Sequence, residues 1–221
     1  KQQNSAFISY TPLMLIINEV AWAGTIASYD DEWIELYNPG STTINFDTNP
    51  GWRLVADDGS PDILLTGSIV SNGYFLLERV SEQVTNVTAN QFFSGTLEDT
   101  GEVLRLRAPD GTIVDTANSD GGAWPAGSVS SYRSMERMGS TLSDTLLSWV
   151  TFNDTVFIAK DAGGNDIYGT PGGANWGYTV TQTPTPTVTP STTSSPTLTV
   201  TPSLTLSPTY TSTFTSTPSA S

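Results

Sequence analysis

Short runs of β-branched, leucine and aromatic residues, each ended by Gly, Pro, Asn or Asp, follow one another through most of this chain. Such runs are typical of β-strands closed by turns, whereas apolar residues at helical spacing are scarce. The pattern predicts strands at residues 13–22, 32–38, 51–56, 63–65, 74–77, 102–107, 112–116, 133–138 and 148–151. Many short strands joined by turns predict an all-β fold, either a β-sandwich or a barrel.

Alternation within two of these runs predicts which side chains face a core. In 102–107 the leucines are expected to point inward and the arginines outward. In 32–38, Ile34 and Leu36 share one face, and Glu35 lies on the other face between two aromatic residues. Because large aromatic side chains are costly to leave in water, we expect this second face to be partly covered as well.

The last charged residue is Asp166, and from residue 181 onward the chain is almost entirely Thr, Ser and Pro. Such a composition buries too little apolar surface to offset the entropy of ordering. We therefore expect an N-terminal extension (1–9), one β-sandwich domain (10–178) and a disordered Thr/Ser/Pro-rich stalk or linker (179–221). Forty residues of an extended proline-containing chain would reach about 120 Å, and the hydroxyls are candidates for O-glycosylation.

Composition narrows the classes of partner. The chain has 22 acidic residues, 8 basic residues and no histidine, which gives a formal net charge of −14. Binding to phosphate backbones or to anionic lipid relies on Lys and Arg, so we expect neither nucleic acid nor a membrane surface as partner. No apolar run approaches the length of a membrane-spanning helix. Cysteine is absent, so stability depends on a packed core rather than on disulfides. The partners that remain are a protein or a surface polymer.

Catalytic chemistry is also restricted. Without His or Cys the chain cannot form a Ser-His-Asp triad, a thiol nucleophile or a His-ligated metal site. A carboxylate pair of the glycosidase type remains, and Glu19 and Glu35 are its best candidates because both lie on predicted strands beside aromatic residues. The interpretation we favour is that these carboxylates are structural and cap turns or pair with arginine, so no catalytic residue is assigned. The candidate partners are Arg53, Arg105, Arg107 and Arg137.

Other features suggest ligands. Three acidic segments offer oxygens to calcium: Asp30–Glu32, Asp57–Asp58, and Asp161 with Asn165 and Asp166. None has EF-hand spacing, and solvated turn residues are the favoured interpretation, so no cofactor is expected; calcium at one acidic loop is the alternative.

Tryptophans beside loops could stack on sugars or serve as core residues, namely Trp22, Trp124, Trp149 and Trp176. Trp124, beside Pro125 in a Gly-rich loop, is the first to test. Asn86 and Asn153 begin sequons that matter only in a host with N-glycosylation machinery.

Four segments resemble the lamin-tail domain, in the form found in exported bacterial proteins. Residues 17–20 (INEV) resemble the opening strand of that family, and residues 32–39 (EWIELYNP) with 51–54 (GWRL) resemble its second strand and turn. Residues 100–106 and 110–115 resemble its central hairpin. Residues 134–137 (SMER) and 169–175 (GTPGGAN) resemble its closing segments. The resemblance extends over residues 13–176.

The resemblance implies an immunoglobulin-like β-sandwich and a non-catalytic role. It leads us to expect a binding or tethering module of a secreted or cell-surface bacterial protein, with contacts made by loops at one end of the sandwich. A first alternative is an accessory domain that positions a nuclease- or phosphatase-type hydrolase outside this fragment. A second is a carboxylate-based hydrolase. The association of lamins with chromatin does not carry over, because it uses basic surface and this chain is acidic.

Overall fold

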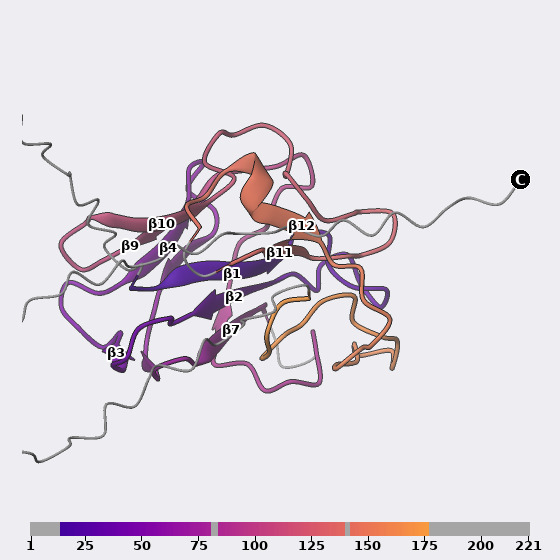
Figure 1. Ribbon diagram of the computed structural model, residues 1–221, viewed down its shortest axis with the longest axis horizontal. Coiled ribbons are helices and arrows are strands. Elements are labelled where there is room, and N and C mark those ends of the chain that lie inside the picture. Colours follow the sequence, from indigo (N-terminus) through magenta and orange to yellow (C-terminus); the bar gives the residue numbers. More distant parts are fainter. Residues whose placement is uncertain (1–13, 81–83, 140–141, 177–221) are drawn as a thin grey trace, which may run out of the picture. The chain divides into compact units, whose positions relative to one another are not determined.

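The predicted strands form two main sheets in a computed structural model, which describes residues 14–80, 84–139 and 142–176 (Figure 1). The chain divides into two units, Lys1–Val180 and Thr181–Ser221, and every described residue belongs to the first. The expected extension (1–9) and stalk (179–221) lie outside the described residues.

The larger sheet has six strands in the order β12-β11-β1-β2-β7-β8. Its strands are β1 (Ile16–Ala21), β2 (Trp33–Tyr37), β7 (Tyr74–Arg79), β8 (Gln91–Phe93), β11 (Met135–Arg137) and β12 (Trp149–Thr151). Neighbours are antiparallel except for β7 and β8, which run parallel. The centre of this sheet therefore joins segments from both ends of the described chain.

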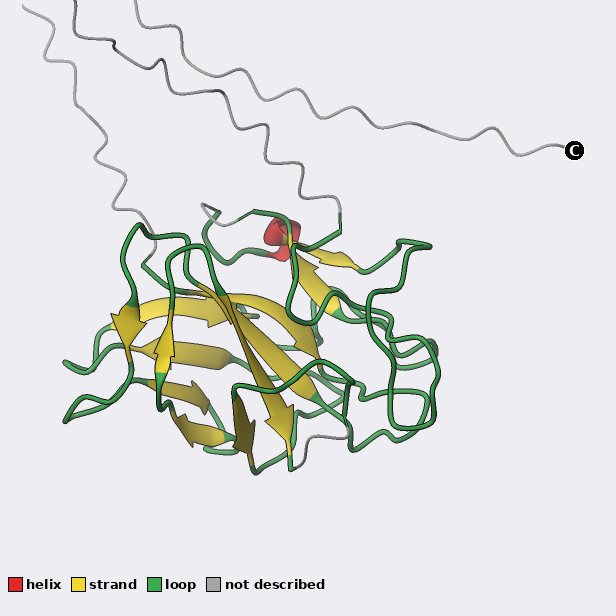
Figure 2. Cartoon of the chain, turned by 90° about the horizontal axis from the view of Figure 1, so that it is seen from below, coloured by secondary structure: helices red, strands yellow, loops and turns green. Residues whose placement is uncertain are grey.

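The second sheet has four antiparallel strands in the order β10-β9-β4-β5. These are β4 (Arg53–Ala56), β5 (Asp62–Leu64), β9 (Leu104–Arg107) and β10 (Ile113–Ala117). A small pair, β3 (Ile44–Asn45) and β6 (Ser68–Ile69), and a 3₁₀ turn, Leu146–Ser148, complete the described elements. Strands dominate Figure 2, and loops gather mainly at one end. The predicted all-β class is confirmed, as are all nine predicted strands; β3, β6 and β8 were not predicted.

The main core lies between the two sheets. It includes Ile34, Leu36 and Leu77 from the larger sheet and Leu104 and Leu106 from the smaller, all of them inaccessible to solvent. Burying each such side chain stabilises the fold by about 1.5–3 kcal/mol. The inward leucines of β9 alternate with partly exposed arginines, as predicted.

A second apolar cluster covers the outer face of the larger sheet. Trp33, only 1% exposed, packs there with Leu76 of β7 and with Ala159 and Ile167 from the C-terminal loops. The expectation that β2 is covered on both faces is therefore confirmed.

An irregularity in β1 places two polar residues side by side on this outer face. The pairing register with β2 shifts between Ile17 and Glu19, so one extra residue is inserted. Ile17 and Val20 both point into the main core, while Asn18 and Glu19 both bond to groups on the outer side. Simple alternation would have placed Glu19 in the apolar core.

Candidate functional site: a cluster of buried glutamates

Three glutamates lie side by side across the outer face of the larger sheet. Glu19 on β1 is directly opposite Glu136 on β11 and Glu35 on β2. All three side chains are inaccessible to solvent. The sequence-predicted pair, Glu19 and Glu35, is thus adjacent, and Glu136 is a third member that sequence reasoning missed. The sequence signal that could have identified Glu136 was its position in the segment 134–137 (SMER).

Residues 169–176, called here the closing strap, cross over these carboxyls and bond to them through backbone N–H groups. Thr170 N donates to Glu19 Oε1 at 2.9 Å, and Gly172 N donates to Glu35 Oε2 at 2.5 Å. Trp176 N donates to Glu136 Oε2 at 3.1 Å. Each glutamate therefore satisfies one N–H of a segment that has no strand partner of its own.

Side-chain donors complete the cluster. Ser134 Oγ donates to Glu19 Oε1 at 2.5 Å, and Asn18 Nδ2 donates to Glu35 Oε1 at 2.9 Å. The Thr170 hydroxyl lies 2.7 Å from Glu19 Oε2 and 2.9 Å from Glu136 Oε1. This hydroxyl is therefore the bridge between two of the three carboxyls.

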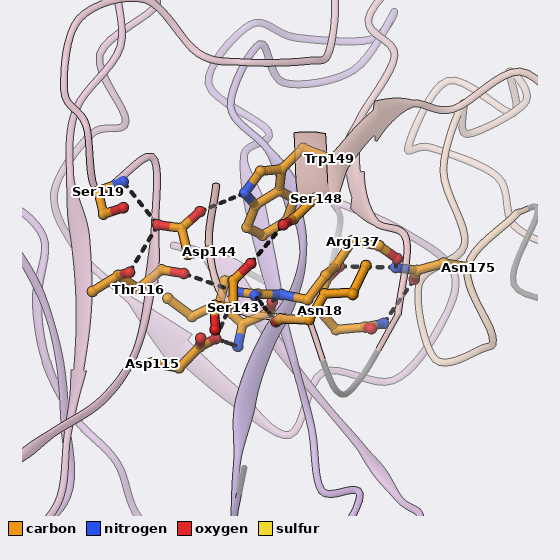
Figure 3. A network of polar contacts seen from close by, with 12 residues as sticks. Asn18, Asp115, Thr116, Ser119, Arg137, Ser143, Asp144, Ser148, Trp149 and Asn175 are labelled. Atoms are coloured by element: carbon orange, nitrogen blue, oxygen red, sulfur yellow. Dashed lines mark hydrogen bonds and ion pairs between the residues drawn. The ribbon is translucent and has the colours of Figure 1, made fainter. Parts of the chain in front are cut away.

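Asn175 fixes the far end of the closing strap. Its amide donates to the backbone oxygens of Asn18 at 2.9 Å and Arg137 at 2.8 Å. Its Oδ1 accepts a bond of 2.7 Å from Asn18 Nδ2. Asn18, the extra residue of β1, thus connects Asn175 with the glutamate cluster, and Figure 3 shows the two asparagines beside Arg137.

Burial and mutual repulsion raise the pKa values of these carboxyls. Burial, reinforced by Glu136, raises the pKa of Glu19 to about 8, against the opposing effect of the bonds from Ser134 and Thr170. Burial and the charge of Glu19 raise the pKa of Glu35 well above its usual value. Burial raises the pKa of Glu136 to about 7. The cluster therefore retains protons at neutral pH.

The arginines predicted as partners of Glu19 and Glu35 pair elsewhere, which corrects that part of the prediction. Arg137 is buried on the opposite side of β11, where Nη2 bonds Asp115 Oδ2 at 2.7 Å and Nε bonds the Ile17 backbone oxygen at 2.8 Å (Figure 3). Its guanidinium lies 4.5 Å from the centre of the Trp149 ring. Alternation along β11 explains the difference, because Glu136 and Arg137 must face opposite sides.

The other three arginines lie on the four-stranded sheet. Arg53 pairs with Asp62 at 2.7 Å, Arg105 pairs with Asp57, and Arg107 donates to a backbone oxygen at 3.4 Å. These contacts are at least partly exposed, and exposed pairs contribute about 0–1 kcal/mol each.

All three glutamate side chains are fully covered by the described part of the chain. A small hollow beside Trp33 and Tyr168 has room for about one water molecule, and none of the three glutamates lines it. In this arrangement the carboxyls can accept hydrogen bonds and share protons, while their oxygens stay covered by the protein's own chain.

The acidic segments considered for calcium are engaged by donors of the protein. Asp30 pairs with Arg79 at 2.9 Å, and Asp57 pairs with Arg105. Asp161 accepts bonds from the N–H groups of Ala27, Gly163 and Asn165. Within residues 14–80, 84–139 and 142–176, no group of three or more Asp or Glu side chains is placed to hold a metal ion.

Three of the four tryptophans are core residues, as the core interpretation predicts, and Trp124 is therefore not a sugar platform. Trp124 is 8% exposed and stacks on Trp22 at 6.1 Å between ring centres, and both rings belong to the main core. Trp149 is covered by Arg137. Trp176, 36% exposed, is the one of the four whose ring remains open to solvent. The sequon residues Asn86 and Asn153 are also exposed.

A second buried carboxyl lies away from the cluster. Glu102 is buried, and neither carboxyl oxygen has a hydrogen-bond partner in the described part of the chain. Burial raises its pKa to about 8, with further contributions from Asp58, Glu32 and Glu98. This side chain is therefore neutral at pH 7.

Comparison with known proteins names no family. No protein-family model matches the sequence, and a search of curated proteins finds no significant match. Among the described residues, no helix is both long and apolar enough to cross a membrane.

Proposed function

We propose that this chain is a non-catalytic binding or tethering module of a secreted or cell-surface bacterial protein. The observation that carries the proposal is that the buried glutamates bond to the protein's own backbone. The carboxylate pair that the sequence favoured for catalysis, Glu19 and Glu35, is buried under the closing strap and bonded to it. A hydrolase of the glycosidase type needs its two carboxyls open to the scissile bond.

The resemblance to the bacterial lamin-tail domain supports the same role. Its segments at 17–20, 32–39, 134–137 and 169–175 supply the three glutamates and the strap that covers them. Family motifs that meet in a structural cluster favour a scaffold over an active site. Loops on a rigid scaffold are then the expected contact surface, and the partner is a protein or a surface polymer.

The Thr/Ser/Pro composition from residue 181 onward supports tethering. It begins a few residues after the closing strap, which is the last described segment before the expected stalk. Acidic charge on the folded part favours a partner that is neither nucleic acid nor anionic lipid. The first alternative, an accessory domain for a hydrolase outside this fragment, uses the same fold and differs in what the neighbouring domain does.

Two measurements test the proposal. An antibody against residues 14–176 should detect the chain on intact cells of the source bacterium, and added protease should remove that signal. The full chain should show no turnover on glycan and phosphodiester panels. Turnover by the parent that disappears in Glu19→Gln and Glu35→Gln would establish the carboxylate-hydrolase alternative instead. A signal confined to the cell interior would overturn the surface location.

A further inference from the structure

The hydrogen bonds around the Thr170 hydroxyl indicate that one of the neighbouring carboxyl groups carries a proton, which the sequence alone does not reveal. A threonine hydroxyl has one proton to donate. Thr170 Oγ1 nevertheless lies within bonding distance of two carboxyl oxygens, 2.7 Å from Glu19 Oε2 and 2.9 Å from Glu136 Oε1. If both carboxyls were ionised, only one of them could accept the hydroxyl proton. The oxygen of the other would face the lone pairs of Thr170 Oγ1. One carboxyl must therefore supply a proton of its own.

We propose that Glu19 and Glu136 share one proton through the Thr170 hydroxyl, and that loss of this proton releases the closing strap. With the proton present, one carboxyl donates to Thr170 Oγ1 and the hydroxyl donates to the other. At high pH the proton passes to hydroxide in solvent. Two anions then face one hydroxyl proton, and the contact on one side of Thr170 becomes repulsive.

The groups around Glu19 and Glu136 determine how strongly the loss of this proton destabilises the cluster. Glu35 faces Glu19 from β2, and Asp154 acts on Glu136 from the loop after β12, so both neighbouring groups are also acidic. No described basic side chain forms an ion pair with any of the three glutamates; their donors are neutral hydroxyl, amide and backbone groups. An added negative charge is therefore not offset, and raised pKa values of about 8 and about 7 place its appearance near neutral to alkaline pH.

The strap is the element that this charge would displace. Thr170 contributes both its N–H and its hydroxyl to the cluster, and Gly172 and Trp176 contribute one N–H each. The main core lies on the opposite face of the sheet, between the two sheets. Release is therefore expected to be local, with the strap opening before the sandwich unfolds.

Hydrogen exchange in the full chain tests the proposal. Protection factors of the Thr170, Gly172 and Trp176 amides should fall at least tenfold between pH 6 and pH 9.5, while amides of β4 and β9 keep theirs. Glu136→Gln and Glu19→Gln each replace the shared proton with a permanent N–H. Each single variant should keep the strap protected at pH 9.5.

The double variant Glu19→Gln/Glu136→Gln directs two N–H groups at one hydroxyl and leaves its proton only the more distant Asn175 Oδ1, at 3.5 Å, as acceptor. It should protect the strap less well than either single variant at every pH. Asp110→Asn, which removes one negative charge from an exposed turn, is the matched control and should behave as the parent.

Two outcomes overturn the proposal. One is protection of the parent strap that does not change up to pH 9.5. The other is an alkaline transition that keeps its midpoint in both single variants. If a variant fails to fold, carbon-13 shifts of the carboxyl groups in the parent decide: Glu19 and Glu136 should show a titration step above pH 7, and titration of both below pH 6 would refute the shared proton.

Discussion

Arg137 and Arg105 each pair with one aspartate, but their surroundings differ. The Arg137 and Asp115 side chains are 0% and 3% exposed, whereas those of Arg105 and Asp57 are 27% and 45% exposed. Asp115 also accepts the Ile17 N–H at 2.7 Å, so the buried pair links β10 of one sheet to β1 and β11 of the other. Removing one member of a buried pair leaves a charge that nothing compensates.

Arg137→Met should therefore lower the free energy of unfolding by about 3–5 kcal/mol. Arg105→Met, which removes the same side chain from an exposed pair, should lower it by about 1 kcal/mol or less. Urea unfolding of both variants against the parent measures the difference. Equal losses would mean that the Arg137–Asp115 pair does not connect the sheets in the way described.

At the scale of elements, the closing strap depends on close contact with the sheet beneath it. A Cβ at Gly169 would lie 2.6 Å from Glu19 Oε1 and 2.7 Å from Trp33 Cζ2, and both of these side chains are buried. A Cβ at Gly173, in the same strap, would meet only the outer end of the half-exposed Ile158 side chain, at 3.1 Å, and the Thr170 backbone oxygen at 3.5 Å.

Gly169→Ala should displace the strap and cost about 1–3 kcal/mol, because neither buried neighbour can move aside. The Thr170 and Gly172 amides should then exchange faster than in the parent. Gly173→Ala should leave both amides close to the parent values, since the Ile158 side chain can rotate. Similar exchange in the two variants would show that the strap is held loosely.

The strands that could be predicted from the sequence were those with a recognisable pattern of neighbouring residues. Nine strands could be predicted because each has its own apolar run and turn. β3 and β6 have two residues each, too few for a pattern, and β8 pairs in parallel with β7, which no local signal indicates. The glutamate pair was found as two carboxylates on strands. Glu136 was missed because joining β11 to β1 needs a register between residues more than one hundred positions apart.

At the scale of the whole molecule, buried carboxyls reverse the usual dependence of stability on pH. Glu19, Glu136 and Glu102 have folded-state pKa values of about 8, 7 and 8, above the ordinary value of 4.5. Between pH 4.5 and 8 the folded state therefore binds more protons than the unfolded chain. Stability from these groups is fully present below pH 4.5 and is lost as pH rises towards 8.

We expect the free energy of unfolding to fall by several kcal/mol from pH 5 to pH 8, since each proton that the folded state retains over this range contributes up to about 1.4 kcal/mol per pH unit. Asp57 and Asp161, with lowered pKa values, act in the opposite direction only below pH 4. Urea unfolding at pH 5, 6.5 and 8 measures the slope. Repeating it in 0.5 M salt separates surface repulsion, which salt screens, from the buried groups. Stability that rises or stays level over this range would contradict the expectation.

The position of the closing strap also has a mechanical consequence. The strap is the last described segment of the chain, and it bonds to the sheet by the N–H groups of Trp176, Gly172 and Thr170. A load applied at Trp176 would act on the contacts of Trp176 and Asn175 first, then on those of Gly172 and Thr170, before it reached the strands around the main core. Under such a load the hydrogen bonds of the strap would be expected to break before those between the central strands.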